Sequence, residues 1–175
     1  MTKEQAKESN VRKALKPILY AGALVGVLDI TAACIEVYVN YGFAPPRLLK
    51  GVAAGLLGRG AIEGSAGTAA LGLLMHFVMA LTVAAIFYAL SRRLALPQKI
   101  LGVIAVGLVY GAVVFAVNNY ATAPFLSWVR SLYLHTPVSF RHPMGWSQFV
   151  IHLFCVGLPT ALVMHRFAPA ARQAG

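Results

Sequence analysis

Four ionisable side chains stand inside long apolar stretches of the sequence: Asp29, Glu36, His76 and His152. A charge is costly in an apolar medium, so such residues usually face a protein interior or a water-filled cavity. Asp29 and Glu36 are seven residues apart, so on one helix they would share a face, about 10 Å apart along its axis. We expect these residues to meet inside a helical bundle and to carry the chemistry of the protein.

Two asparagines, Asn118 and Asn119, stand near the end of another apolar stretch. His76 and His152 each fall six residues into a predicted helix from the same side, at a depth of about 9 Å. Together with the two carboxylates, these residues predict one polar pocket in the outer half of the bundle.

The residue types of this pocket suit several kinds of chemistry. His76, His152, Glu36 and Asp29 are ligands that a divalent transition metal accepts. Two opposed histidines suit axial ligation of a haem, and a chain of Asp, Glu and His suits the passage of a proton or cation. A polar core that only fixes the helix register would use the same residues. No HExxH or CxxC spacing selects a metal, so a metal ion, a haem and no cofactor at all stay open.

The composition excludes an ordinary soluble enzyme domain. Of the 175 residues, 59% are hydrophobic and 11% are charged, whereas a soluble domain carries about 25% charged residues. The formal charge is +10, but the basic residues lie between and outside the apolar stretches, which indicates a lipid bilayer rather than nucleic acid as partner. GxSxG, GxxxxGKS and GxGxxG motifs are absent from the sequence, so a non-enzymatic membrane protein is favoured.

Four stretches reach the length of about 20 mainly apolar residues that a membrane helix needs. They predict an all-α, polytopic membrane domain at 18–167, with a basic tail at 1–17 and a second tail at 168–175. The predicted spans are 18–39, 70–90, 100–120 and 146–167. The short connection at 91–99 makes the second and third spans antiparallel neighbours, and the four spans form two helical hairpins. Gly22 with Gly26, and Gly107 with Gly111, have the GxxxG spacing typical of close helix contacts.

The basic residues predict the orientation. Ten Lys and Arg fall in the two tails and the 91–99 connection, against five in the connections at 45–69 and 121–145. The positive-inside rule therefore places both termini in the cytoplasm. The Gly/Ala-rich segment 45–69 is expected to form an interfacial helix or a shallow re-entrant turn, and the aromatic segment 121–145 an interfacial stretch with a short helix around 125–134.

The sequence also contains a short repeated pattern. The pattern NYxxAP occurs at 40–45 and again at 119–124, and the span that follows each copy holds one histidine, His76 or His152. This predicts a duplicated helical hairpin as one alternative. Parallel repeats related by an axis along the membrane normal would place the two histidines across from one another.

Short motifs give the chain a loose resemblance to a known group. They are the GxxxG with a following acidic residue in the first span, Ala-Pro-Pro-Arg at 44–47, His76-Phe77, and Ile151-His152. The chain resembles the uncharacterised bacterial inner-membrane proteins of the YagU type. The resemblance implies four helices in a bacterial inner (cytoplasmic) membrane, and it implies no established activity.

The sequence thus leaves three functions open. The first is ion, proton or metal handling through the polar pocket. The second is a structural or assembly subunit, bound to a membrane-protein partner or to copies of itself. The third is a bis-histidine haem protein that uses His76 and His152.

Overall fold

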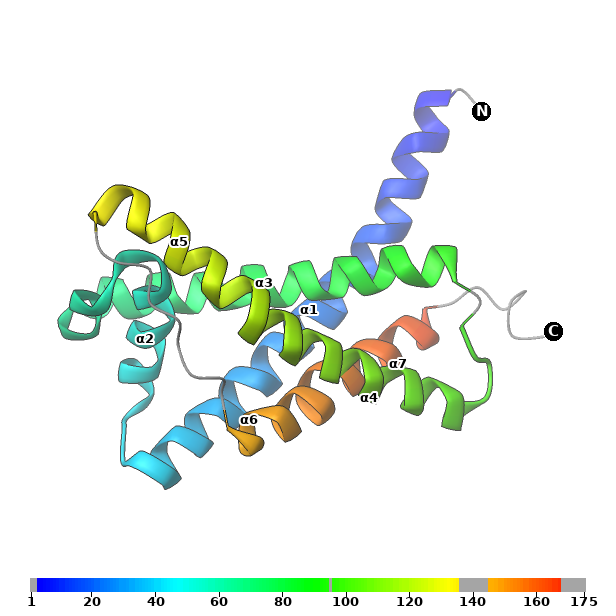
Figure 1. The fold of residues 1–175 in the computed structure, drawn as a ribbon. Helices are drawn as coiled ribbons and strands as arrows, with labels where there is room; N and C mark the ends of the chain where they lie inside the picture. Colours follow the sequence, from blue (N-terminus) through cyan, green and yellow to red (C-terminus); the bar gives the residue numbers. More distant parts are fainter. Residues whose placement is uncertain (1–2, 95, 136–144, 168–175) are drawn as a thin grey trace.

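The computed structural model describes residues 3–94, 96–135 and 145–167, without the side chains of 3–4 and 6–13. Every regular element in these ranges is helical, and four helical segments are long and apolar enough to cross a membrane. The four segments are Ala14–Tyr41, Ala66–Arg93, Ile100–Leu134 and Trp146–Arg166. The predicted all-α fold with four spans is therefore confirmed (Figure 1). The predicted tail at 168–175 lies outside the described residues.

The first half of the chain holds two long helices joined by a structured connection. Helix α1 is Lys3–Tyr41, α2 is Pro45–Leu57, a 3-10 turn η1 is Arg59–Glu63, and α3 is Ala66–Arg93. Two prolines open α2, where a missing N–H costs nothing. Ser65 caps α3 by accepting a hydrogen bond from the backbone N–H of Gly67 at 3.2 Å. Both α1 and α3 extend beyond the predicted spans 18–39 and 70–90.

The second half holds two spans, each interrupted by a π-helical turn. The first runs through α4 (Ile100–Val117), η2 (Asn118–Thr122) and α5 (Ala123–Leu134). The second runs through α6 (Trp146–Ile151), η3 (His152–Gly157) and α7 (Leu158–Arg166). Each wide turn comes just before a proline, Pro124 or Pro159. A proline lacks an N–H and its ring clashes with the carbonyl four residues earlier, and the widened turn accommodates both effects.

Both GxxxG pairs lie at helix contacts within the chain. Helix α1 packs against α3, and α4 packs against η3 and α7. A Cβ on Gly26 would lie 2.5 Å from the Phe77 ring, and a Cβ on Gly107 would lie 3.0 Å from the Ala161 methyl group. The missing side chains let the helices approach closely, as small residues do in membrane bundles.

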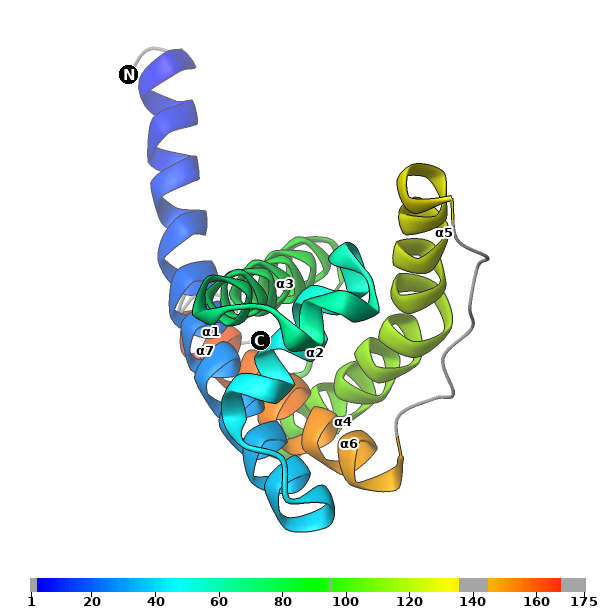
Figure 2. The ribbon, with the colours of Figure 1, turned by 90° about the vertical axis from the view of Figure 1, so that its left-hand side faces the viewer.

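Helix α2 and α5 form a layer at one end of the bundle, called here the α2 end. Helix α2 lies against the start of α3 (Figure 2). At this contact Gly72 has no side chain, which leaves room for the carbonyl group of Leu49. Arg130 of α5 donates hydrogen bonds to the carbonyls of Ala54 and Gly55, each at 3.3 Å. The segment 45–69 is thus a helix and a 3-10 turn packed on the protein, and α5 covers the helix expected around 125–134.

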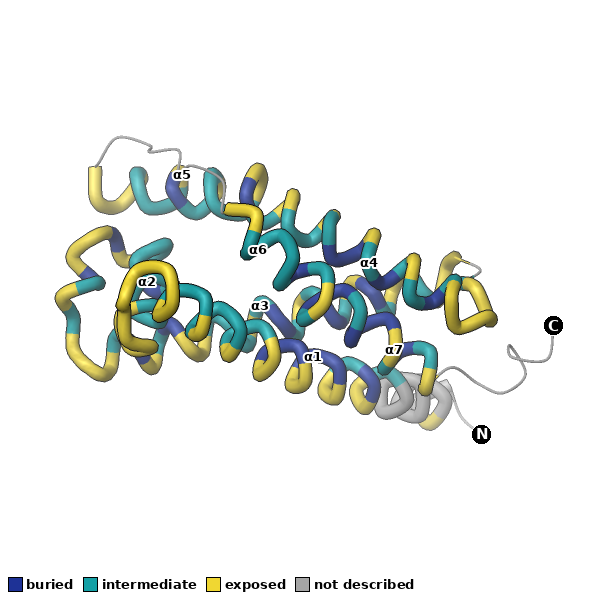
Figure 3. The backbone as a smooth tube through the Cα atoms, turned by 90° about the horizontal axis from the view of Figure 1, so that it is seen from below, coloured by how far each residue is buried: buried dark blue, intermediate teal, exposed yellow. Residues whose placement is uncertain are grey.

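The outward surface of the bundle is apolar. Figure 3 shows the buried residues toward the inside of the helices and the exposed residues on their outer sides. Large apolar side chains are exposed on all four spans, including Leu24, Leu74, Val109 and Phe154. An apolar surface of this extent needs an apolar surrounding, so the chain belongs in a lipid bilayer as a multi-pass membrane protein.

The buried apolar core lies away from the α2 end. It consists of small and aromatic side chains from all four spans: Ala21, Val25, Ala80, Ala84, Phe87, Val103, Tyr110, Val156, Ala161 and Met164. Tyr110 ties α4 to α3 by donating its hydroxyl to the Val83 carbonyl at 2.7 Å. The polar side chains of interest begin one turn beyond Val25, on the side of this core that faces the α2 end.

Candidate functional site

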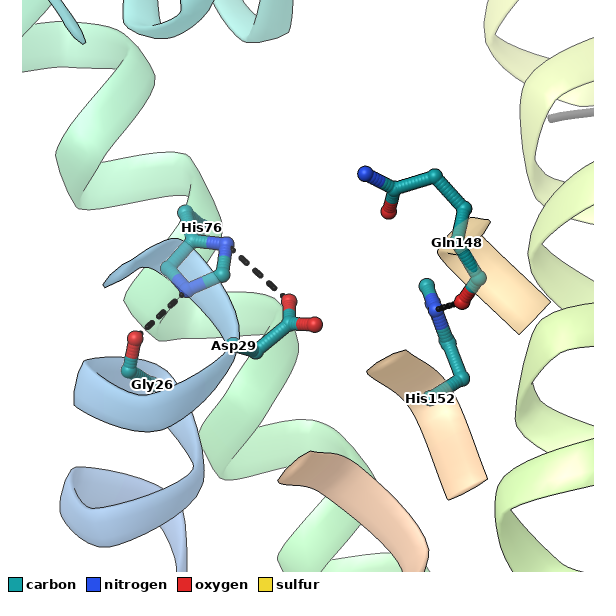
Figure 4. A network of polar contacts seen from close by, with 5 residues as sticks. All are labelled: Gly26, Asp29, His76, Gln148 and His152. Atoms are coloured by element: carbon teal, nitrogen blue, oxygen red, sulfur yellow. Dashed lines mark hydrogen bonds and ion pairs between the residues drawn. The ribbon is translucent and has the colours of Figure 1, made fainter. Parts of the chain in front are cut away.

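The contact between α1 and α3 brings His76 and Asp29 together (Figure 4). His76 Nε2 lies 2.9 Å from the carbonyl oxygen of Gly26, one turn before Asp29 on the same helix. His76 Nδ1 lies 3.9 Å from Asp29 Oδ2. The side chains of His76 and Asp29 are only 13% and 17% exposed. A Cβ on Gly26 would lie 2.5 Å from the ring of Phe77, the neighbour of His76, so the missing side chain lets α3 approach α1 closely here.

The hydrogen-bond partners define the chemistry of His76. A carbonyl oxygen only accepts, so Nε2 must carry a hydrogen and donate it to Gly26. Nδ1 then faces the Asp29 carboxylate either as a lone pair or as a second N–H. The 3.9 Å separation is longer than a hydrogen bond, so the contact is a close approach between an imidazole nitrogen and a carboxylate oxygen. His76 Nδ1 and Asp29 Oδ2 are the two atoms of this contact that can carry a proton.

Asp29 has an oxygen that the described part of the protein does not satisfy. Oδ1 is buried, and no hydrogen-bond donor within the described ranges reaches it. A buried carboxylate oxygen without a donor is costly. The cost is removed when the carboxyl group is protonated or when a donor or cation lies beside it.

The second carboxylate of α1, Glu36, is held very differently. Its Oε1 accepts hydrogen bonds from the Ser147 hydroxyl at 2.7 Å and from the Asn40 amide at 3.1 Å. Its Oε2 accepts from the Gln148 amide at 3.2 Å. Three neutral donors satisfy both oxygens and join α1 to the start of α6. Glu36 is thus fixed in place, and its contacts are those of an interhelical clamp.

His152 stands at the start of η3 and is 6% exposed. Its Nδ1 lies 2.8 Å from the Gln148 carbonyl oxygen, one turn earlier, so Nδ1 carries a hydrogen and the neutral ring keeps its lone pair on Nε2. Figure 4 shows Asp29 between His76 on one side and Gln148 with His152 on the other. Helix α1 packs against η3, the turn that begins at His152.

The two asparagines lie in η2. Asn119 is 9% exposed, and its amide donates to the Phe115 carbonyl at 2.8 Å. The Phe115 ring in turn packs edge-on against the His152 ring, with centroids 5.5 Å apart. Asn118 is half-buried on the same turn. Asn119 and His152 thus both contact Phe115, Asn119 at its backbone carbonyl and His152 at its ring.

The six predicted residues therefore fall into separate groups. Asp29 pairs with His76, Glu36 pairs with the start of α6, and His152 bonds to its own helix. The sequence did not predict Gly26 as the partner of His76, nor Ser147 and Gln148 as partners of Glu36. The only sequence signal for the partners of Glu36 is that Ser147 and Gln148 are polar residues at the start of the fourth span. In each half of the chain, the second glycine of a GxxxG packs beside the histidine: Gly26 lies against Phe77, next to His76, and Gly111 lies against His152. The duplication itself stays a prediction.

The candidate metal ligands lie in separate contacts. Across residues 3–94, 96–135 and 145–167, no three side chains of His, Cys, Asp or Glu gather closely enough to share a metal ion. The two histidines use different nitrogens for their backbone hydrogen bonds, Nε2 for His76 and Nδ1 for His152. Ion, proton, metal and haem binding all stay predictions.

Comparisons of the chain with protein-family models, curated proteins and solved structures found no match. The site geometry is therefore the basis on which a function is assigned.

Proposed function

We propose that this chain is a small integral membrane protein that takes up and releases a proton at the Asp29–His76 pair inside its helical bundle. The observation that carries the proposal is the position of His76. Its Nε2 is bound to the Gly26 carbonyl at 2.9 Å, which directs Nδ1 to Asp29 Oδ2 at 3.9 Å. Ionisable groups at this depth in a span are costly, and they commonly serve the movement of protons or ions.

The contrast between the two carboxylates of α1 supports the proposal. Three donors hold Glu36 and satisfy both of its oxygens. Asp29 has one basic partner and one buried oxygen without a donor. A protonated carboxyl beside a neutral imidazole and a carboxylate beside an imidazolium both satisfy the contact. The proton therefore has two places to reside, which is what a site for proton exchange needs.

We also propose a bacterial inner membrane with both termini in the cytoplasm. Helix α1 begins, α3 ends, α4 begins and α7 ends at the end of the bundle opposite α2 (Figure 1). Arg92, Arg93 and Lys99 stand at that end, beside the basic start of α1. The positive-inside rule places this end in the cytoplasm, and the resemblance to YagU-type proteins supports the same membrane. In this orientation Asp29 and His76 lie toward the outer half of the bundle.

Proton flux into liposomes tests the proposal. The purified chain is reconstituted with a pH-sensitive dye inside, and a potassium diffusion potential drives protons inward. We expect wild-type protein to acidify the interior faster than empty liposomes do. His76→Gln keeps an amide that can donate to Gly26 but cannot carry the proton, and Asp29→Asn removes the carboxylate, so each should lose most of the flux.

His165→Gln is the matched control, since it makes the same change in the last turn of α7, far from Asp29 along the spans. It should retain wild-type flux. Wild-type protein that acidifies liposomes no faster than the lipid alone would overturn the proposal. So would wild-type flux in both H76Q and D29N.

A further inference from the structure

We propose that an anionic phospholipid binds at the seam between the start of α1 and the end of α7, with its phosphate group at Lys16 and Tyr20. This inference goes beyond the proposed function, because it concerns the lipid-facing surface at the end opposite α2 and not the Asp29–His76 pair. The seam lies where the basic start of α1 meets Phe167, the residue that directly follows α7.

One aromatic ring joins the two helices at this seam. The Lys16 ammonium nitrogen lies 5.9 Å from the centre of the Phe167 ring, within the range of a cation–π contact. The Tyr20 ring packs on the same Phe167 ring, with centroids 5.7 Å apart. Lys16 and Tyr20 are four residues apart on α1, so they are neighbours on one face of that helix. Contact with one ring and position on one helix face therefore place these two side chains side by side.

Both side chains present their donors to the surroundings of the bundle. Lys16 is exposed, and Tyr20 is 60% exposed. An ammonium group has three N–H donors, and a phenol has one O–H donor. A phosphate group accepts hydrogen bonds from both, and those from an ammonium group are charge-assisted and therefore strong. The pair thus offers one positive charge and two neighbouring donor groups, which suits the phosphate monoanion of a phospholipid.

The face of α1 that carries this pair continues as an apolar stripe. Leu24 and Leu28 follow at the same four-residue interval and are 42% and 38% exposed. From the end of the bundle inward, the stripe therefore consists of an ammonium group, a phenol and two leucines. A phospholipid presents its phosphate, its ester region and its acyl chains in the matching order. A soluble phosphate compound has nothing to place against the leucines, so the stripe favours a lipid.

The charges around the seam favour a lipid with a net negative charge. In the part of the chain that the structure describes, exposed cations also stand at this end of the bundle: Arg92, Arg93, Lys99 and Arg166. The carboxylates whose side chains are described lie elsewhere, Asp29 and Glu36 further along α1 and Glu63 in η1. The ammonium group of a zwitterionic lipid would therefore meet cations here and none of the described carboxylates, whereas an anionic lipid is attracted.

Native mass spectrometry of the full chain in mild detergent tests the proposal. Phosphatidylglycerol and phosphatidylcholine with the same acyl chains are added in equal amounts. We expect the chain to retain phosphatidylglycerol at least about fivefold more than phosphatidylcholine, since each basic side chain near the headgroup adds to the attraction. Glycerol 3-phosphate carries the phosphate without acyl chains, and it should not displace the bound lipid at the same concentration. These comparisons need no variant.

Variants then locate the site. Lys16→Gln removes the charge and should weaken phosphatidylglycerol binding by about fivefold. Tyr20→Phe keeps the net charge and the ring and loses only the hydroxyl donor, so it should weaken binding by about threefold. Lys50→Gln makes the same change as K16Q on α2, at the other end of the bundle, and should keep the wild-type affinity.

Equal retention of the two lipids by the wild-type chain would overturn the inference. Displacement of the lipid by glycerol 3-phosphate would also overturn it, because the acyl chains would then contribute nothing. Unchanged phosphatidylglycerol binding in both K16Q and Y20F, or an equal loss in K16Q and K50Q, would show that the lipid does not bind at this seam.

Discussion

The imidazole of His76 donates to the carbonyl of Gly26 at 2.9 Å, across the contact between α3 and α1. This bond fixes which nitrogen faces Asp29, and it lies where the missing side chain of Gly26 leaves room for the ring of Phe77, the neighbour of His76. The first GxxxG of the chain therefore does two things, since it packs two helices closely and exposes a backbone acceptor to a buried histidine.

Filling the space at Gly26 should separate the two helices. In Gly26→Leu, the new side chain meets the Phe77 ring, which a Cβ alone would approach to 2.5 Å. We expect the free energy of unfolding to fall by about 1–3 kcal/mol, as overpacking does elsewhere. Unfolding in mixed micelles measures the change. Gly51→Leu is the control, because a Cβ there meets nothing within 4 Å, and equal losses in both variants would contradict the packing argument.

The hydrogen bonds from Arg130 should stabilise the end of α2. Arg130→Met keeps an unbranched apolar chain but loses the donors to Ala54 and Gly55. Losing about 1 kcal/mol of such bonding speeds amide exchange by roughly fivefold. Hydrogen exchange measured over 45–57 tests this expectation. Arg59→Met, an exposed residue of η1, should leave the exchange rates unchanged, and a similar increase in both variants would argue against a specific clamp.

Glu36 should contribute to stability rather than to proton flux. Glu36→Gln replaces one accepting oxygen by an NH2 group, which then faces the donors of Ser147, Asn40 or Gln148. We expect a loss of about 1–3 kcal/mol in unfolding free energy. A double-mutant cycle with Ser147→Ala should give a coupling energy of about 0.5–3 kcal/mol, because the two side chains are in contact. Additive effects would show that the 2.7 Å contact does not couple them.

The two buried histidines should differ in tautomer. His76 must carry a hydrogen on Nε2, and the neutral His152 ring must carry its hydrogen on Nδ1. Nitrogen NMR spectra of 15N-histidine-labelled protein distinguish protonated from unprotonated ring nitrogens. Assignment comes from the loss of signals in H76Q and H152F. An unprotonated Nε2 in His76, or the Nε2–H tautomer in His152, would contradict the hydrogen bonds described.

The sequence alone predicts the spans and the polar residues because both depend on local composition. Long apolar stretches indicate membrane helices, and Asp29, Glu36, His76 and His152 are conspicuous within them. Which carboxylate meets which histidine depends on how the helices are rotated and staggered, and hydropathy does not encode that.

The rest of the site depends on contacts that a residue pattern cannot specify. The Gly26 carbonyl is a backbone group, and Ser147 with Gln148 reaches Glu36 only after α6 packs beside α1. The π-helical turns place His152 and Asn119, and they follow from prolines that lie several residues further along. The residues predicted to share one pocket therefore lie in separate contacts, among them the Asp29–His76 pair and the clamp at Glu36.

The most direct test of proton exchange at the Asp29–His76 pair is an infrared difference spectrum of the full chain in lipid, recorded between acidic and alkaline pH. We expect carboxyl and imidazole bands for the proton shared by Asp29 and His76. These bands should be lost in both D29N and H76Q and kept in Glu63→Gln, which removes an exposed carboxylate elsewhere. A pH-dependent spectrum that neither D29N nor H76Q changes would contradict proton exchange at this pair.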